Sequence, residues 1–311
     1  MASRFAKAAI ASALLGMMSV AGQTASAQTA LNFASTPNPG ATVAYVAADQ
    51  KMFEAEGLKV DMQFVGLDSN LPAAVTSGSV DFVSMSPTAF LRALDGGLDV
   101  VAICDSADIN KDVQDFGIAV QPGIEKPADL EGKSVGVPGI GSILDVLAKA
   151  WLGEQKVAVE KVHFVEAQFP VHMDLMKAKK IDAIVSVDPF LGNMLQIGTA
   201  KYLVYLNKAF PAGKPVNLMV TTRSWASAHP KEVAAIRSAV QRAADFGNSH
   251  PEELRRILGT MLKRPPEAMK AVALPLLAAD LPADKIAWWI DLMKSQKLLD
   301  TDVTPQKAML Q

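Results

Sequence analysis

The 311-residue sequence predicts an α/β fold of two lobes, each a mainly parallel sheet flanked by helices, with a helical C-terminal tail on the first lobe. Three observations support this prediction. Strand patterns alternate with helix patterns from about residue 31 to residue 206, and the second half of this run repeats the order of the first. After residue 222 the patterns are almost wholly helical, and each expected helix has a proline at or near its first turn.

The first half of the pattern begins with a short apolar strand at 31–34 and a helix at 41–56 that Gly57 closes. Residues 58–64 alternate between apolar and polar side chains, which is the period-two pattern of a half-buried strand. The remaining expected elements are a helix at 70–76, a strand at 80–84, a helix at 87–94 and a strand at 99–105.

The second half follows the same order, with strands at 133–137, 162–165, 181–187, 202–205 and 217–222. The expected helices run over 142–155 and 170–180, and a further helix begins at Pro189. The tail helices are expected at 230–246, 251–262, 266–277 and 282–297. Trp288 and Trp289 lie in the last of these and are expected to pack in its amphipathic face.

Residues 79–87 and 180–189 resemble each other, because each has a strand followed by a proline-started helix. The second copy has one extra residue before its proline. Any two strand-to-helix units share such features. The alternative is that two related lobes present a strand end and a helix start to a shared ligand cleft.

The N-terminal residues predict a signal peptide over 1–27. Arg4 and Lys7 precede a short apolar run, and Ala25-Ser26-Ala27 supplies the small residues that a signal peptidase recognises. A retained anchor helix is the alternative interpretation. Cleavage after Ala27 predicts a freely soluble periplasmic protein. It is not a lipoprotein, because the only cysteine, Cys104, lies far from that site.

Charge and composition exclude several classes of function. Removal of Arg4 and Lys7 leaves 28 basic against 32 acidic residues, a net charge of −4, which argues against nucleic-acid binding. One cysteine permits no internal disulfide. The four histidines show no metal-ligand spacing, so we expect no metal and no cofactor.

Several stretches resemble the nitrate/sulfonate/taurine-type periplasmic binding proteins of ABC importers, a branch of the type II periplasmic binding protein fold. These stretches are residues 38–40 with 51–58, residues 73–82, residues 129–142, and residues 181–184 with 187–190. The chain departs from many of these relatives at Val187-Asp188-Pro189, where they have Trp-Glu-Pro. The resemblance therefore provides no aromatic ring over the ligand at this position.

The resemblance implies a discontinuous first lobe, with the chain crossing twice between the lobes. The implied ranges are 28–115 plus 222–311 for the first lobe, 120–216 for the second lobe, and 116–120 and 217–221 for two hinge strands. Such hinges permit the lobes to close around a ligand. The implied partners are a small-molecule solute, an ABC permease in the membrane and, through it, an ATPase. We expect a monomer.

Three helix starts are candidate ligand-binding elements, because each offers free backbone N–H groups and a small polar side chain near the predicted cleft. The alternative for Ser86 and Ser142 is a purely structural N-cap, which contributes about 1 kcal/mol. Two weaker candidates, Gln168 and Phe190, are expected on the same wall as Asp188. The full set of candidate ligand-binding residues is Thr36, Asn38, Ser86, Thr88, Gly139, Gly141, Ser142, Gln168, Asp188 and Phe190.

Asp188 has two interpretations. It either caps the helix that begins at Pro189, or it accepts hydrogen bonds from an amine or a ring N–H of the ligand. The second interpretation favours a taurine-like aliphatic sulfonate, with nitrate, an aromatic acid and a pyrimidine as alternatives.

No catalytic residue is predicted, because no nucleophile–base pair stands out. An enzyme on the same fold, of the pyrimidine-forming or dehydratase type, and a ligand-sensing accessory protein are the alternative functions.

Overall fold

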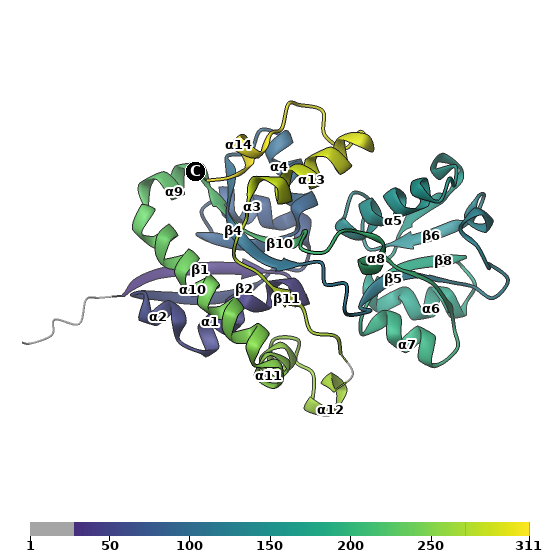
Figure 1. Cartoon of the computed structure of the whole chain (residues 1–311), viewed down its shortest axis with the longest axis horizontal. Helices are drawn as coiled ribbons and strands as arrows, with labels where there is room; N and C mark the ends of the chain where they lie inside the picture. Colours follow the sequence, from purple (N-terminus) through teal and green to yellow (C-terminus); the bar gives the residue numbers. More distant parts are fainter. Residues whose placement is uncertain (1–27, 271, 311) are drawn as a thin grey trace, which may run out of the picture.

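The computed structural model describes residues 28–270 and 272–310, so the predicted signal peptide lies outside the described residues. Figure 1 shows two lobes side by side along the long axis, each with its own sheet. The strand orders are β11-β4-β10-β3-β1-β2 in the first lobe and β7-β6-β8-β5-β9 in the second. The predicted two-lobed α/β fold is therefore confirmed.

The first sheet contains β1 (Thr29–Ser35), β2 (Leu58–Phe64), β3 (Phe82–Met85), β4 (Val100–Asp108), β10 (Pro215–Thr222) and β11 (Leu276–Leu277). Strand β1 pairs in parallel with β2 and β3, whereas β10 runs antiparallel to both β3 and β4. Strands β1 to β4 thus point the same way, and their carboxyl ends lie along one edge of the sheet.

The helices of the first lobe are α1 (Thr42–Asp49), α2 (Met52–Ala55), α3 (Leu71–Thr76), α4 (Pro87–Asp95), α9 (Arg223–Ala228), α10 (Pro230–Ser249), α11 (Pro251–Met261), α12 (Pro266–Met269), α13 (Ala283–Ser295) and α14 (Pro305–Ala308). The single helix predicted over 41–56 is divided, because Lys51 has a left-handed φ of 55° between α1 and α2.

The helix predicted over 266–277 is wrong beyond Met269. Leu276 and Leu277 form β11, which pairs antiparallel with the edge of β4 at Asp108 and Ala107. Backbone pairing with an open strand edge overrides the local helix pattern here.

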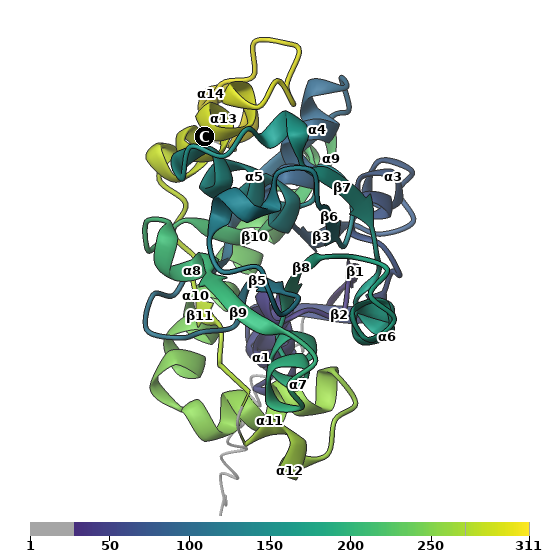
Figure 2. The same cartoon turned by 90° about the vertical axis from the view of Figure 1, so that its right-hand side faces the viewer.

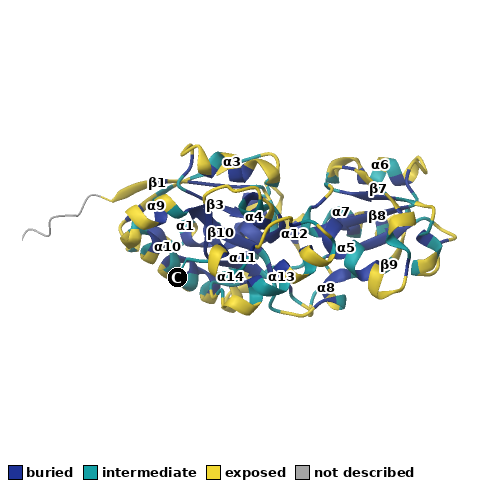
Figure 3. Ribbon diagram, turned by 90° about the horizontal axis from the view of Figure 1, so that it is seen from above, coloured by how far each residue is buried: buried dark blue, intermediate teal, exposed yellow. Residues whose placement is uncertain are grey.

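The second sheet contains β5 (Phe116–Val120), β6 (Ser134–Val137), β7 (His163–Glu166), β8 (Ala183–Val187) and β9 (Lys201–Tyr205). Strands β6, β7 and β8 are parallel, and β5 runs antiparallel to β8 and β9. The helices of this lobe are α5 (Ile143–Glu154), α6 (His172–Lys177), α7 (Phe190–Gln196) and α8 (Leu206–Ala209). Figure 3 shows buried strands beneath partly exposed helices in both lobes.

The chain passes between the sheets outside the two strands that were expected as hinges. Strand β5 lies wholly in the second sheet and β10 lies wholly in the first. The passages are therefore residues 109–115 and residues 210–214. The predicted division of the chain between the lobes stays a prediction.

The strand register shows which edges of the two sheets face the passages. At the first passage, β4 ends at Asp108, which pairs with Pro215, the first residue of β10. Strand β5 begins at Phe116, which pairs with Val187, the last residue of β8. The carboxyl ends of β4 and β8 therefore lie where the lobes meet, which is where ligands bind in open α/β sheets.

The two lobes also touch through helices on one side of the junction. Helix α5 contacts both α4 and α13. Figures 1 and 2 show α6 and α7 on the opposite side of the second lobe from α5. One continuous apolar cluster includes Phe90 and Ile286 of the first lobe and Leu147 of α5. Gln296 Nε2 donates a hydrogen bond of 2.8 Å to the carbonyl of Val146 in α5.

The tail helix α13 is anchored in the core, as its sequence predicts. Trp289 is fully buried, and its Nε1 donates to the Pro215 carbonyl at 2.8 Å. Its neighbour Trp288 packs edge-on against Phe210 and Trp289. Over residues 28–270 and 272–310, no helix combines the length and the apolar character that a membrane crossing needs.

Candidate functional site

The candidate site is the junction where the carboxyl ends of both sheets face each other. On the first lobe, a buried polar cluster joins the ends of β3, β4 and β10. Asn217 Nδ2 donates to Ser84 Oγ at 3.0 Å, and Ser106 Oγ donates to the Gly40 carbonyl at 2.7 Å. A Cβ at Gly40 would collide with the Asn217 side chain, so the turn at 39–41 packs directly onto the strand ends.

Thr36 and Asn38 lie in this turn, as the sequence predicts for the first helix start. Asn38 Nδ2 donates to Thr36 Oγ1 at 2.7 Å, and both side chains are partly exposed. The Asn38 amide oxygen can still accept a hydrogen bond, and the Thr36 hydroxyl can still donate one. The 3₁₀ turn at 39–41 runs directly into α1, so this helix start carries the dipole of the joined helix.

The second predicted helix start already holds a carboxylate of the protein. Ser86 Oγ donates to Asp68 Oδ2 at 2.5 Å, and the Ser86 N–H donates to Asp68 Oδ1 at 3.1 Å. Ser86 Oγ also accepts the Ala89 N–H at 3.2 Å, so Ser86 is the N-cap of α4. The Thr88 hydroxyl is buried 3.1 Å from Ser86 Oγ. Burial raises the pKa of Asp68, and the Ser86 hydrogen bonds oppose this rise.

The third predicted helix start, at Gly139 to Ser142, is also occupied by carboxylates. The Gly141 N–H donates to Asp145 Oδ2 at 2.7 Å, and the Ile140 N–H donates to Glu166 Oε1 at 2.9 Å. Ser142 Oγ accepts the Asp145 N–H at 3.5 Å as the N-cap of α5, and its own N–H donates to the Gly139 carbonyl at 3.0 Å. Lys149 neutralises Asp145 at 2.8 Å.

These carboxylates change what the two helix starts can bind. The sequence predicted that these N–H groups would welcome an anion, but Asp68, Asp145 and Glu166 already accept several of them. Asp145 could have been found from the sequence, because Ser142-x-x-Asp145 is a capping-box pattern. Asp68 has no such local signal, since it reaches Ser86 only through the fold.

Arg92 links the lobes beside these helix starts. It lies in the last turn of α4, and its Nη1 donates to the Ile140 carbonyl of the second lobe at 3.4 Å. Gly141 has a φ of +77°, and a Cβ there would collide with the Arg92 guanidinium. The left-handed φ favours glycine at this position, and the missing side chain leaves room for Arg92.

Two of the remaining candidates, Asp188 and Phe190, belong to an acidic–aromatic cluster, which we define as Asp115, Phe169, Asp188, Phe190 and Tyr205. The Phe169 and Phe190 rings stack with centroids 5.5 Å apart and an interplanar angle of 14°. The Asp188 N–H donates to the Asp115 carbonyl at 2.7 Å, which joins the start of β5 to the end of β8. Gln168 precedes Phe169, and its side chain is exposed.

The environment of Asp188 fits both of its predicted interpretations. Its Oδ1 accepts the Gly192 N–H at 2.9 Å, so it stabilises the first turn of α7. Burial raises the pKa of Asp188, and the pKa of Tyr205 is raised by burial, by Tyr202 and by Asp188. The sequence missed the aromatic pair here, because Phe169 and Phe190 follow different strands.

His172 of the second lobe has a structural role. His172 is buried, with Nδ1 2.9 Å from Ser186 Oγ and Nε2 2.7 Å from the Ala167 carbonyl, and burial lowers its pKa. Over the part of the chain that the structure describes, no three His, Cys, Asp or Glu side chains lie close enough to bind a metal ion together.

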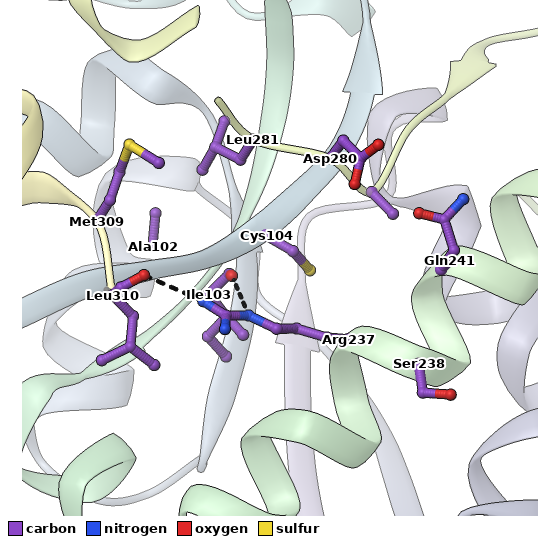
Figure 4. A pocket seen from close by; sticks show the side chains of 11 residues that line it. Ala102, Ile103, Cys104, Arg237, Ser238, Gln241, Asp280, Leu281, Met309 and Leu310 are labelled. Atoms are coloured by element: carbon purple, nitrogen blue, oxygen red, sulfur yellow. Dashed lines mark hydrogen bonds between the residues drawn. The ribbon is translucent and has the colours of Figure 1, made fainter. Parts of the chain in front are cut away.

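A cavity of about 450 Å³ lies on the first lobe between β4, α10 and the C-terminal segment (Figure 4). Arg237 lines it and donates from Nε to the Ile103 carbonyl at 2.8 Å and from Nη2 to the Leu310 carbonyl at 3.2 Å. Cys104 also lines it, and burial raises the pKa of its thiol. None of the predicted ligand-binding residues lines this cavity.

Comparison with known proteins gives one family and several similar structures. The family described as NMT1/THI5 like matches residues 38–254. A binding protein of Brucella abortus (strain 2308) is 23% identical over 225 residues, which cover 72% of this chain and 68% of that protein.

The alkanesulfonate-binding protein SsuA of Xanthomonas axonopodis pv. citri, bound to MOPS, has a TM-score of 0.76 and 18% identity, over 92% of this chain and 99% of that one. The aliphatic sulphonate-binding SsuA of Escherichia coli has a TM-score of 0.76 and 16% identity, over 90% and 97% of the two chains. The nitrate-binding NrtA of Synechocystis PCC 6803 has a TM-score of 0.72 and 13% identity, over 89% and 83%. The fold is thus the type II periplasmic binding protein fold.

Proposed function

The chain belongs to the NMT1/THI5-like family, and from this premise we propose that it is the solute-binding protein of an ABC importer. The observation that supports this function best is the meeting of the carboxyl ends of two sheets across two passages of chain. Similar structures bind alkanesulfonates or nitrate. The protein would capture a solute in the periplasm and deliver it to a membrane permease coupled to an ATPase.

Capture would occur by closure of the lobes about residues 109–115 and 210–214. The helical contact of α5 with α4 and α13 closes one side of the junction. The acidic–aromatic cluster lies on the other side of the second lobe, at the start of α7 and near α6 (Figure 2). The solute would touch Thr36 and Asn38 from the first lobe and Gln168, Asp188 and Phe190 from the second.

The side chains at this junction favour a solute that carries a hydrogen-bond donor. Two of the predicted anion-binding helix starts already hold protein carboxylates. Asp188 and the Phe169–Phe190 stack offer an acceptor and an apolar surface. A taurine-like sulfonate has an ammonium group for Asp188 and an acceptor-rich end for the first lobe. Nitrate has no hydrogen-bond donor and fits less well. An amino-substituted pyrimidine is the alternative solute, because it has both a donor and a flat ring.

A thermal-shift screen of the mature protein, residues 28–311, tests this function. The panel contains taurine, alkanesulfonates, nitrate, aromatic acids and pyrimidines, and a ligand that binds only the folded state raises Tm with concentration. We expect a saturable rise with at least one donor-bearing compound. A protein that no class stabilises, and that instead converts one of these compounds to product, would contradict the proposal in favour of an enzyme.

A further inference from the structure

Asp115 occupies a special place in the fold. It is the last residue of the passage 109–115, directly before β5. Because Phe116 pairs with Val187 and the Asp115 carbonyl accepts the Asp188 N–H at 2.7 Å, Asp115 and Asp188 are neighbours at the junction of the lobes. They are 73 positions apart, and the sequence identified Asp115 only as a lobe boundary.

One oxygen of the Asp115 carboxylate lacks a partner. Its Oδ1 atom is buried and receives no hydrogen bond from residues 28–270 or 272–310. Burial raises the pKa of Asp115 to about 6 and Asp188 adds to the rise, whereas hydrogen bonds from the backbone N–H groups of Asp115 and Phe116 oppose it. Within the described ranges, neither Asp115 nor Asp188 forms an ion pair, whereas Asp145 pairs with Lys149 at 2.8 Å.

Two neighbouring carboxylates without a cation are unfavourable unless a hydrogen-bond donor or a cation binds to them. Two acidic groups at one partly buried place repel each other, and a buried carboxylate oxygen without a donor loses the hydrogen bond that water would give. Buried polar atoms in folded proteins are nearly always satisfied, so an unsatisfied one calls for a missing partner. Phe190, two positions after Asp188, stacks on Phe169, and Asp188 raises the pKa of Tyr205, so aromatic rings that can attract a cation lie near the pair.

We propose that Asp115 acts with Asp188 to bind a nitrogen donor of the transported solute, either an ammonium group or a ring amine. The inference rests on the proposed function and narrows its ligand to nitrogen-bearing solutes. The solute's N–H groups supply the partner that Asp115 Oδ1 lacks. Asp115 is thereby a ligand-selecting residue that the sequence pattern did not reveal.

The first arm of the test needs no ligand. Asp115→Asn replaces the carboxylate with a neutral group of the same shape, so we expect the Tm of the free protein at pH 7 to rise. Asp112→Asn is the matched control, because Asp112 lies in the same passage and is exposed. A fall in Tm for Asp115→Asn, with no change for Asp112→Asn, would show that the Asp115 charge is structural and would overturn the inference.

The second arm uses two matched pairs of probes, taurine against isethionate and 4-aminopyrimidine against pyrimidine, measured by calorimetry. The wild-type protein should bind a nitrogen donor more tightly than its analogue, and Asp115→Asn should weaken only that binding, by about 10- to 100-fold. Tighter binding of the amine-free probes overturns the assignment of Asp115 but leaves the proposed function intact. A wild-type protein that binds none of the four probes, but is stabilised by another class of the thermal-shift panel, overturns the assignment of Asp115 and leaves the proposed function intact.

Discussion

Two pairs of carboxylates lie at the two ends of the passage 109–115, and the protein treats them differently. Asp105 and Asp108, near the end of β4, both bind Lys285 of α13, at 2.7 and 2.6 Å. Asp115 and Asp188, at the start of β5 and the end of β8, have no cation among the described residues. The first pair fastens the tail helix to the first lobe, and the second faces the junction between the lobes.

The two pairs differ in whether a lysine of the protein compensates the buried carboxylates. Burial and Asp108 raise the pKa of Asp105, and Lys285 lowers it in part. For Lys285, burial acts to lower the pKa, but Asp105 and Asp108 raise it, so the ammonium stays charged. The pair near the end of β4 has its own cation, although Asp108 Oδ1, like Asp115 Oδ1, receives no hydrogen bond from the described residues. The Asp115–Asp188 pair has no cation, so a hydrogen-bond donor from solution can still bind to it. Ionisable residues with perturbed pKa values are typical of binding sites.

The largest expected effect comes from removing the cation that binds Asp105 and Asp108. Lys285→Met leaves two buried carboxylates without a cation and should lower the free energy of unfolding by about 3–5 kcal/mol. Urea unfolding at pH 7 measures this loss. Lys214→Met is the control, because its partner Asp284 is 74% exposed and the loss should stay below about 1 kcal/mol. Equal losses for the two variants would mean that the buried cluster has no special role.

A smaller effect of opposite sign, a gain in stability, should follow when the Asp115–Asp188 pair loses one charge. Burial raises the pKa of Asp115 from its ordinary value of 3.8 to about 6 in the folded protein. The folded state therefore binds this proton more tightly, so Asp115 favours folding below about pH 4, and that benefit is lost as the pH rises to about 6. Asp115→Asn should be more stable than wild type at pH 7 by up to about 3 kcal/mol, less any solvent screening of the partly exposed side chain.

The pH dependence of the stability difference shows whether it comes from the Asp115 charge or from a change of shape. The stability difference between Asp115→Asn and wild type should be close to zero at pH 4 and should grow as the pH rises through 6. Tm measured across this range gives the difference directly. The groups that face Asp115 are Asp188 and, beyond it, Tyr205. A difference that stays constant with pH would show that shape, and not charge, distinguishes the variant.

The smallest effect measures the coupling within the Asp115–Asp188 pair. Asp188→Asn keeps an oxygen that can accept the Gly192 N–H, so the first turn of α7 should stay intact. In the double variant, the second substitution should stabilise less than it does alone, by about 0.5 kcal/mol or more. Additive single effects in a double-mutant cycle would mean that the two charges do not interact.

Several features of the fold follow from local sequence. The alternation at 58–64 coincides with β2, Leu58–Phe64, because a half-buried strand needs a period of two. Proline in the first turn marks the starts of α4, α10 and α11. Ser86 and Ser142 were predicted as possible caps, and both cap their helices. The sequence failed at the strand β11 and at Lys51, where pairing and a left-handed turn override the helix pattern.

The candidate site was only partly predictable. Asp188 and Phe190 were found because they follow a strand and begin a helix, which is a local pattern. The neighbours that give them chemical meaning come from distant parts of the chain: Asp115 from the passage 109–115 and Phe169 from the end of β7. Asp68 has no local signal at all, although it controls the start of α4 through Ser86.

By itself, the sequence determined the order of elements, the two-lobed α/β class and the family, because hydrophobic period, caps and turn residues act over only a few positions. The tertiary structure decided which carboxylates have a cation. Lys285 reaches Asp105 across 180 positions, whereas Asp115 and Asp188 meet without one. Charge pairing depends on distances of a few ångström in space, and only the folded chain sets those distances.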